Sequence, residues 1–477
     1  MDDVEVAYAP AWLQARWIRD KEISCRELVD LYLGRIDRVN VALNCFITVA
    51  REYAQEAADE ADRKAAGERG PFHGVPIAIK DMADTAEIRT TWGSAGFRDR
   101  VPHRDSPAVR RLKASGFLIL GKTNTPEFAS GPTDPVGYGP CRNPWDPDRS
   151  VFGSSGGSAA AAAAALCAVA HGSDAGGSIR EPAAACGVVG FKPSRGRVSN
   201  DLPGFDYLNQ EGPITRTVTD AAAVLDCMAG SDPGDPYRAA ALERPMVEEV
   251  VRTPKPLRIA YMTPSTRILR EGPGLTEIGL TAEPVMWDAV LRAAAVLDGL
   301  GHYLKEDGPD WGGSMHEVAL HRYHAAAWLA HEDVLPRFSV LDPIQQAAFE
   351  GVRALSLKSY LQTMNAAQVC ARDVERFWTD FDIALMPTLA RLPPLVADLR
   401  DADGRTTAVA NGGPFTFFWN ITGQPAVSLP LYQSAGGLPV GVQLVGRVGD
   451  EATLFRVSGQ LEGAMPWASR RPPGTGV

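Results

Sequence analysis

The order of apolar and polar positions along the chain predicts short buried strands that alternate with helices. A capping box at Ser24–Glu27 precedes apolar residues at helical spacing, and an Ala-rich stretch over about 51–66 continues the helical pattern. Gly74–Lys80 is apolar up to its last residue, which predicts a buried strand that ends at a lysine. A serine–proline pair at 106–107 predicts the start of the next helix. This alternation is typical of an α/β fold.

The rest of the chain repeats the alternation, with one Pro-rich interruption and a Pro/Gly-rich tail. Residues 132–147 carry five prolines and predict an ordered loop or a run of turns, and the tail over 470–477 is expected to be frayed. No internal repeat and no interdomain linker is evident, so a single large domain is the simplest interpretation. Further strands are expected at 117–120, 382–386, 425–430 and 441–445, and further helices at 217–230, 284–300, within 314–378 and at 451–462.

Composition and charge argue against several classes of partner. The 477 residues are 45% hydrophobic and 22% charged, as in globular proteins, and they carry a net charge of −10. Nucleic acids and anionic membranes attract clustered Lys and Arg, so neither is an expected partner. The N-terminus lacks the apolar segment of a signal peptide, and the most apolar stretch, 159–170, is too short to span a bilayer. The seven cysteines form no CxxC pair, which fits a reducing, cytoplasmic location.

Two Gly/Ser-rich segments are candidates for catalytic loops. Gly153–Ser158 precedes seven alanines, which favour a helix, so its N–H groups would lie at the positive end of a helix dipole. Ser173–Arg180 places Ser178 after two glycines, and consecutive N–H groups beside a hydroxyl suit an oxyanion hole. The first segment alone is equally well explained as a solvated turn that caps a buried helix, and the second alone is better explained as a tight turn.

Lys80, at the end of its apolar strand, is a candidate general base. A buried charged amine is costly unless it is paired or neutral, and burial lowers the pKa of a lysine so that its amine can accept a proton. The structural alternative is a strand-end lysine that reaches solvent. A serine nucleophile needs a base, and no histidine lies in a comparable Gly-rich setting, so Lys80 can serve if a second hydroxyl relays the proton.

These motifs, together with several other blocks, resemble the amidase signature family. Lys80, the GSSGGS run and the DAGGSIR run carry the resemblance, and the blocks keep their order over roughly 70–445, most of the chain. The remaining blocks are Gly121–Asn124, Arg142–Pro147, Cys186–Pro193, Gly212–Arg216, Gly423–Pro430 and Gly437–Gln443.

The resemblance implies one α/β domain over 1–477, with a large twisted mixed β-sheet surrounded by α-helices, and it implies no cofactor and no metal. Within this domain we expect an N-terminal helical part (1–66), a catalytic signature core (70–230), a helical elaboration that covers the pocket (265–380), and C-terminal strands and a helix that complete the core (381–470).

Functional roles follow from the same resemblance. Ser178 would be the nucleophile, Ser154 would bridge it to Lys80 next to a cis peptide, and Lys80 would be the general base. An aromatic pocket would favour anilides, aryl carbamates, esters or lactam-like oligoamides. The other implied residues are the oxyanion N–H donors Ala175, Gly176, Gly177 and Ser178; the supporting residues Ser155, Asp174 and Arg180; the acyl-side loop Phe128, Ala129, Ser130 and Gly131; and Phe152 and Trp419, as an aromatic wall or, alternatively for Trp419, as core packing.

The chain departs from the family pattern just before the serine pair. Pro-Gly-Gly is usual there, whereas this chain has Val151-Phe152-Gly153, so two bulky side chains lie close to the catalytic loop. We expect the shape of the loop or the lining of the pocket to differ. The replacement of the usual threonine by Ser173 is a milder change.

Two other catalytic interpretations fit less well. Gly153–Gly157 formally matches the GxSxG elbow of α/β-hydrolases, but that fold needs a later histidine and none follows His331. A loose histidine cluster lacks a matched carboxylate and the fixed ligand spacing of a zinc site. Its members are His316, His321, His324 and His331.

We therefore expect a stand-alone amidohydrolase that acts on a small-molecule amide, ester or carbamate, with a homodimer allowed. One alternative is the glutaminase subunit of a tRNA-dependent amidotransferase, which would require a protein partner and an ammonia channel. A catalytically inactive scaffold is a further alternative, which the presence of Lys80, Ser154 and Ser178 disfavours.

Overall fold

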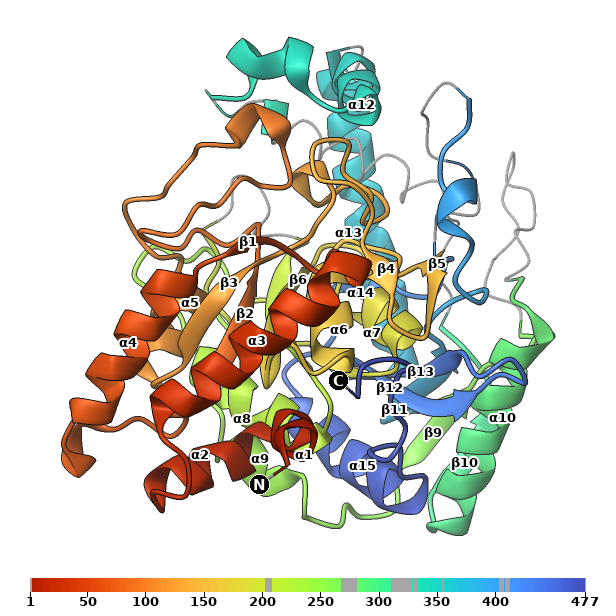
Figure 1. The fold of residues 1–477 in the computed structure, drawn as a ribbon. Helices are drawn as coiled ribbons and strands as arrows, with labels where there is room; N and C mark the ends of the chain where they lie inside the picture. Colours follow the sequence, from red (N-terminus) through yellow and green to blue (C-terminus); the bar gives the residue numbers. More distant parts are fainter. Residues whose placement is uncertain are drawn as a thin grey trace.

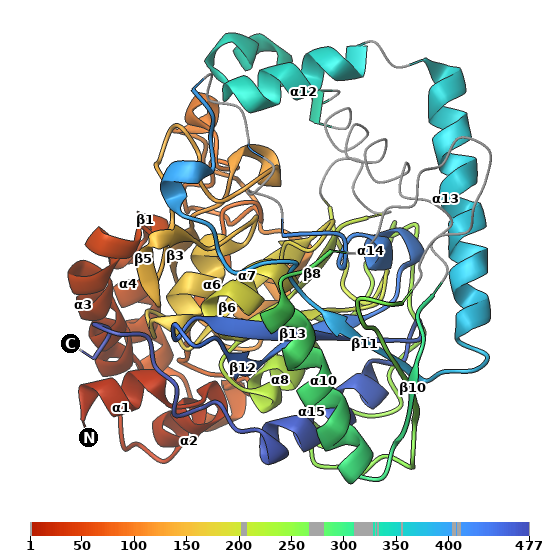
Figure 2. The same ribbon diagram turned by 90° about the vertical axis from the view of Figure 1, so that its right-hand side faces the viewer.

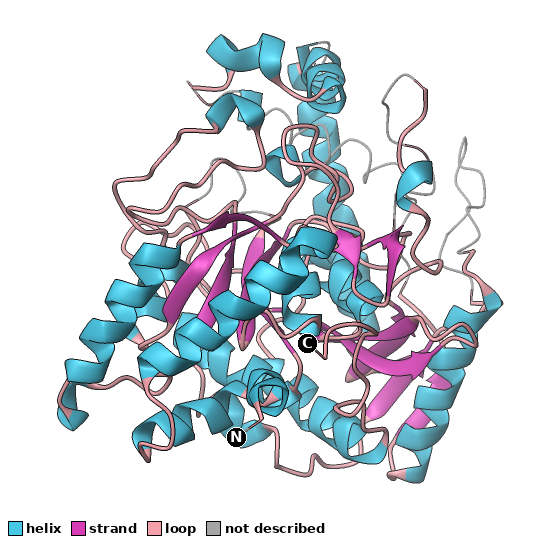
Figure 3. Cartoon of the chain, in the orientation of Figure 1, coloured by secondary structure: helices cyan, strands magenta, loops and turns pink. Residues whose placement is uncertain are grey.

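A mixed β-sheet lies at the centre of the molecule, and helices surround it (Figures 1 and 3). In the described part of the chain the sheet has eleven strands in the order β1-β3-β2-β6-β8-β7-β12-β13-β11-β9-β10. The predicted α/β domain is therefore confirmed. The computed structural model describes residues 2–201, 208–266, 281–309, 328–329, 331, 333–353, 356–402, 407 and 412–476.

The strands of the sheet come from the whole length of the chain. They are β1 (Phe46–Val49), β2 (Pro76–Lys80), β3 (Leu118–Thr123), β6 (Val169–Asp174), β7 (Val189–Lys192), β8 (Gln210–Thr215), β9 (Arg258–Tyr261), β10 (Tyr303–Glu306), β11 (Ile383–Pro387), β12 (Ala426–Gln433) and β13 (Pro439–Gly446). The pair β4 (Arg142–Asn143) and β5 (Asp146–Ser150) forms a separate two-stranded sheet.

The neighbours of β2 determine where its last residue lies. Strand β2 is buried along its whole length and pairs in parallel with β3 on one side and β6 on the other. The carboxyl ends of parallel strands meet at one edge of a sheet, where ligands bind in many α/β proteins. Strand β6 in turn pairs antiparallel with β8. Lys80, at the end of β2, and Asp174, at the end of β6, therefore lie at the same edge.

Helices form where the apolar periodicity predicts them. Ser24 makes the expected capping box with Glu27 at the start of α3. The alanine run forms the buried helix α6, which contacts β2, β6 and α7; alanine favours a helix and its small side chain permits close packing. The helices are α1 (Asp3–Tyr8), α2 (Ala11–Arg19), α3 (Cys25–Leu43), α4 (Arg51–Arg63), α5 (Pro107–Ala114), α6 (Gly156–Ala163), α7 (Arg180–Cys186), α8 (Val218–Met228), α9 (Met246–Glu249), α10 (Pro284–Gly299), α12 (Pro343–Arg353), α13 (Leu357–Phe377), α14 (Phe418–Thr422) and α15 (Glu451–Ala464).

The expectation of a frayed tail is wrong. Thr475 is buried, and its carbonyl accepts a 2.6 Å hydrogen bond from the guanidinium of Arg35. Arg471 also forms an ion pair with Glu5, at 2.7 Å. These contacts hold the C-terminal segment against the N-terminal helices, so the Pro/Gly composition of the tail reflects its turns rather than disorder.

Two parts of the chain deviate from the simplest prediction. The Pro-rich stretch 132–147 is ordered as expected, but it also contains β4 and the start of β5. Helix α12 lies at the top of the view in Figure 2, and α13 runs down the right-hand side and packs against α14. The stretch 265–380 is not purely helical, because it also supplies the edge strand β10. Residues 310–327 of the expected helical block lie outside the described residues.

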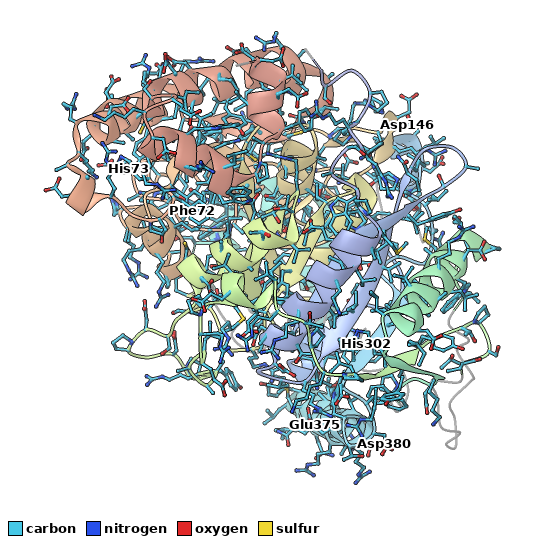
Figure 4. All side chains as sticks on the ribbon, turned by 90° about the horizontal axis from the view of Figure 1, so that it is seen from below. Phe72, His73, Asp146, His302, Glu375 and Asp380 are labelled. Carbon is cyan, nitrogen blue, oxygen red and sulfur yellow. The ribbon has the colours of Figure 1, made fainter. Side chains whose placement is uncertain are left out.

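His73 and His302 lie on different sides of the molecule, and each has structural contacts (Figure 4). His302 accepts a hydrogen bond from the backbone N–H of Leu257, and its other ring nitrogen lies 3.1 Å from Oε1 of Gln460 on α15. A ring nitrogen of His73 lies 3.0 Å from the carbonyl oxygen of Ala61. Both imidazoles therefore connect backbone segments to neighbouring elements.

Candidate active site

Lys80 is completely buried at the end of β2 and points into a cluster of serines. Its Nζ donates to Oγ of Ser154 at 2.7 Å, and to Oγ and the carbonyl oxygen of Ser173 at 3.0 and 3.2 Å. Burial lowers the pKa of Lys80 from 10.5 to about 7, while the charges of Asp174 and Glu211 oppose this shift. The alternative of a lysine that reaches solvent is therefore wrong. Near neutral pH a substantial fraction of this amine is uncharged.

The loop that precedes α6 places Ser154 and Ser155 against the end of β6. The peptide bond between Gly153 and Ser154 is cis. Oγ of Ser155 donates to the carbonyl oxygen of Ser173 at 3.1 Å, and the N–H of Ser155 donates to the carbonyl oxygen of Ser178 at 3.0 Å. Ser155 thus connects the two Gly/Ser loops through the backbone, which keeps Ser154 and Ser178 in the same part of the molecule.

Asp174 shapes the loop that carries Ser178. Its carboxylate accepts the N–H of Gly177 at 2.7 Å and that of Ile179 at 3.1 Å, and it forms a two-pronged ion pair with Arg180 at 2.9 Å. Burial opposes ionisation of this carboxyl, but the charge and hydrogen bonds of Arg180 outweigh it and hold the pKa of Asp174 well below its usual range. The loop is therefore bent around a permanent negative charge.

The same contacts determine which N–H groups of the loop are available. The N–H of Gly177 is already donated to Asp174, which removes Gly177 from the predicted set of oxyanion donors. Within the described residues the N–H groups of Ala175, Gly176 and Ser178 donate to no protein acceptor, and these three residues are partly exposed in an otherwise buried region. Three backbone donors therefore lie free beside the hydroxyl of Ser178.

Arg180 connects the loop to the C-terminal half of the chain. Its guanidinium donates to Oε1 of Gln443 and Oδ1 of Asn420 at 2.7 Å, and to the carbonyl oxygen of Thr416 at 2.8 Å. Asn420 also donates to the carbonyl oxygen of Asp174 at 2.7 Å. These partners could not be predicted from the sequence around Arg180. The available signal was indirect: a buried arginine requires several acceptors, but nothing in the local pattern says where they lie.

The predicted acyl-side loop is compact and rich in unusual backbone angles. Phe128 and Ala129 have φ values of 52° and 59°, and Gly131 has 98°. The ring of Phe128 is buried and stacks on Trp328 with centroids 4.8 Å apart. Ser130 is half-buried, and Gly131 is exposed. The backbone of this loop, rather than the Phe128 ring, is therefore its accessible part.

Phe152 and Trp419, the candidate aromatic wall, are both 0% exposed. Phe152 packs against Ala184, Ala185 and Leu389, and Nε1 of Trp419 donates to the carbonyl oxygen of Phe415 at 3.0 Å. This burial favours the packing interpretation for both side chains. Phe152 also has a φ of 56°, the left-handed region in which the family's usual glycine is at ease. Its departure from the family pattern thus leaves the backbone in a glycine-like conformation and fills the core.

His331, the one described member of the predicted loose histidine cluster, does not belong to a metal centre. His331 packs edge-on against Trp92, and its Nδ1 accepts the N–H of Asp333 at 3.3 Å. His316, His321 and His324 lie outside the described residues. Where the chain is described, no group of three or more His, Cys, Asp or Glu side chains could hold a metal ion. In the same residues, no helix combines the length and apolar character needed to cross a bilayer.

Fold, site and comparisons together define a hydrolase of carbon–nitrogen bonds other than peptide bonds. The amidase family model matches residues 27–455, and the chain belongs to this family. The chain is 35% identical to the 6-aminohexanoate-cyclic-dimer hydrolase of Paenarthrobacter ureafaciens, over 97% of this chain and 96% of the relative.

Solved structures show the same relationship. The 6-aminohexanoate cyclic dimer hydrolase with its substrate superposes with a TM-score of 0.89 at 32% identity, covering 98% of this chain and 99% of that one. A bacterial aryl acylamidase of the amidase signature family gives a TM-score of 0.86 at 26% identity, with 97% of each chain covered. A subunit of the glutamyl-tRNA(Gln) amidotransferase of Thermotoga maritima is more distant, with a TM-score of 0.72 at 27% identity over 93% of this chain and 92% of that one.

Proposed function

We propose that the protein hydrolyses amide-type bonds through an acyl-enzyme on Ser178, with Ser154 and Lys80 as a proton relay. The observation that carries this proposal is the 2.7 Å hydrogen bond between Nζ of the fully buried Lys80 and Oγ of Ser154. A buried amine that is partly neutral at pH 7 can draw a proton from a hydroxyl, which an ordinary solvated lysine cannot.

The reaction proceeds in two acyl transfers. Oγ of Ser178 forms a bond to the carbonyl carbon, while its proton passes to Ser154 and the proton of Ser154 passes to Lys80. The oxyanion is held by the N–H groups of Ala175, Gly176 and Ser178. The carbon–nitrogen bond then breaks as the relay returns a proton to the leaving nitrogen. Water attacks the acyl-enzyme along the same path and releases the acid and free Ser178.

The substrates are expected to be apolar amides with an aryl or oligoamide character. A buried aromatic cluster of Trp92, Phe97, Phe128 and Trp328 lies behind the predicted acyl-side loop. These rings are buried, so they support the loop rather than contact a substrate. An apolar pocket in front of the loop would favour anilides, aryl carbamates, aryl esters and lactam-like oligoamides over small polar amides. The similarity to the cyclic-dimer hydrolase and to the aryl acylamidase supports the same range. A cytoplasmic location and activity without a protein partner are part of this proposal, which also allows a homodimer.

A hydrolysis panel with the purified chain tests the substrate class. The panel comprises an anilide, an aryl carbamate, a p-nitrophenyl ester, the cyclic 6-aminohexanoate dimer, a small primary amide and glutamine. We expect kcat/KM to be highest for the aryl and oligoamide substrates, and a fluorophosphonate probe to label Ser178 in peptide mapping. Glutamine as the best substrate would favour the amidotransferase alternative, and a probe that labels no residue would favour an inactive scaffold.

Replacing Gly177 with Ala is expected to lower kcat/KM about 100-fold or more. Gly177 has a φ of 134°, and a Cβ there would lie 2.4 Å from Oγ1 of Thr416 and 2.5 Å from Oε1 of Glu181. Oγ1 of Thr416 lies 2.8 Å from both Oε1 of Glu181 and the carbonyl oxygen of Gly176 and shares its one proton between them, so the new methyl would displace the contacts that position the neighbouring N–H donors. Losing one such donor typically costs on the order of 100–1000-fold in rate.

Gly437→Ala is the matched control for this substitution. Gly437 also has a positive φ, 83°, but no atom lies within 4 Å of the position that a Cβ would take, and it is exposed between β12 and β13. It should therefore carry a similar backbone cost without the clash. Steady-state kinetics of both variants on one anilide measure the difference. Equal activities would show that the Gly177 loop takes no part in catalysis.

A further inference from the structure

A buried acid–imidazole pair lies behind the candidate base and takes no part in the relay described above. Nε2 of His171, on β6, lies 3.6 Å from Oε2 of Glu211, on β8. His171 is 0% exposed and Glu211 is 2% exposed. Neither the two ring nitrogens of His171 nor Oε2 of Glu211 have a hydrogen-bond partner within the described residues. Buried polar atoms without partners are costly, so their presence beside a reactive group calls for a functional explanation.

The strand register places this pair next to the contacts of Lys80. Ser173, which accepts two hydrogen bonds from Lys80, is directly opposite Glu211 in the antiparallel pairing of β6 with β8. Directly opposite residues project to the same face of a sheet, and so do residues two apart on one strand. His171, Ser173 and Glu211 therefore share one face, and Ser173, opposite Glu211, is also in contact with the amine of Lys80.

The charges around Lys80 differ in how far they are already neutralised. Two carboxylates, Asp174 and Glu211, act on the amine electrostatically. Asp174 is locked in its ion pair with Arg180. Among the described residues the ion-pair partner of Glu211 is His171, which adds a positive charge only when it is protonated. Glu211 also acts electrostatically on the carboxyl of Asp201. Burial, and then the negative charge of Glu211, raise the pKa of Asp201 to about 6.

We propose that Glu211, which lies beside His171, is a positioning residue that stabilises the positive charge which Lys80 acquires when it takes the nucleophile's proton. The inference rests on the proposed function, because it presupposes that Lys80 is the base. A carboxylate close to the amine lowers the cost of forming an ammonium in a buried site. Without it, Lys80 stays neutral to lower pH but is a weaker base, so the relay draws the proton from Ser178 less effectively.

Glu211→Gln tests the proposal through the pH dependence of kcat/KM on an anilide. The acidic limb reports the ionisation of the base in the free enzyme. Loss of the negative charge makes the ammonium easier to deprotonate, so we expect this limb to move by about one unit toward lower pH. We also expect the plateau to fall about tenfold, as for a weaker base. Glu211→Asp should restore most of both properties, because it restores the charge.

Glu462→Gln, on α15, is the control. Glu462 accepts the N–H of Val218 at 3.1 Å, an interaction that a glutamine carbonyl can keep. Burial raises the pKa of Glu462 to about 7, so the substitution removes a negative charge away from Lys80 only above that pH. It should leave both limb and plateau unchanged. Fluorophosphonate labelling of Ser178 confirms that each variant is folded.

Two outcomes separate this inference from the proposed function. If the acidic limb of the pH profile of Glu211→Gln coincided with that of the wild type, the proposed role of Glu211 would be wrong, whatever the height of the plateau. The proposed function would not be affected. A Lys80→Met variant that remains fully active would overturn the relay itself, whatever Glu211 does. A purely structural role of Glu211 predicts lower activity with no shift of the limb and with poor rescue by aspartate.

Discussion

Ser178→Ala is expected to lower kcat/KM about 10⁴-fold or more on every substrate that the wild type hydrolyses. Loss of the nucleophile removes the acyl-enzyme path and leaves only the weak catalysis of the oxyanion donors and of binding. The loss should appear in kcat, because the N–H groups of Ala175 and Gly176 and the surrounding pocket remain. Single-turnover experiments should likewise show no rapid release of the leaving group.

The same variant should fold normally. The contact that Ser178 makes with the first serine loop runs through its backbone, because its carbonyl oxygen accepts the N–H of Ser155. Alanine keeps this carbonyl, and Ser178 is partly exposed, so the free energy of unfolding should change by less than about 0.5 kcal/mol. Ser231→Ala, at an exposed loop position, is the matched control and should keep full activity. More than about 1% residual activity in Ser178→Ala would contradict its role as nucleophile.

The parts of the site that sequence analysis could predict are those encoded locally. The apolar run that ends at Lys80 forms β2, and the alanines after the GSSGGS run form α6. The register between parallel strands then brings the ends of β2 and β6 to one edge. Local patterns and the topology rules of α/β sheets were sufficient for these features.

The remaining features depend on contacts between distant parts of the chain. Nothing near Arg180 indicates that its guanidinium binds Thr416 and Asn420, more than 230 residues away. The occupied N–H of Gly177 follows from the way the loop folds back on Asp174, which a motif does not specify. The ordered tail has the same origin, because Thr475 is held by a side chain of α3. Composition alone predicts mobility there, and tertiary contacts override it.

Lys80→Met should reduce kcat/KM by about 10³-fold. A general base contributes on the order of 10²–10⁴ in rate, and methionine fills a similar volume without an amine. The wild-type rate should rise with pH through about pH 7, where the buried amine loses its proton, because burial lowers the pKa of Lys80 to about 7. The variant's residual activity should lack this rise. A pH–rate profile measured from pH 5 to 9 compares the two.

The free energies of unfolding of the wild type and of Lys80→Met should diverge as the pH changes. The lowered pKa of Lys80 determines the direction of this divergence. Between about pH 7 and 10.5 the unfolded chain keeps the proton on Lys80, whereas the folded chain does not. Wild-type stability therefore gains from each unit of pH rise in this window, by at most about 1.4 kcal/mol per unit. Lys80→Met lacks this dependence, so its thermal midpoint relative to the wild type should be highest near pH 7 and should fall as the pH rises to 9. If the difference between the two thermal midpoints stayed constant over this range, Lys80 would not change its protonation on folding. The proposal of a neutral amine in the resting site would then be wrong.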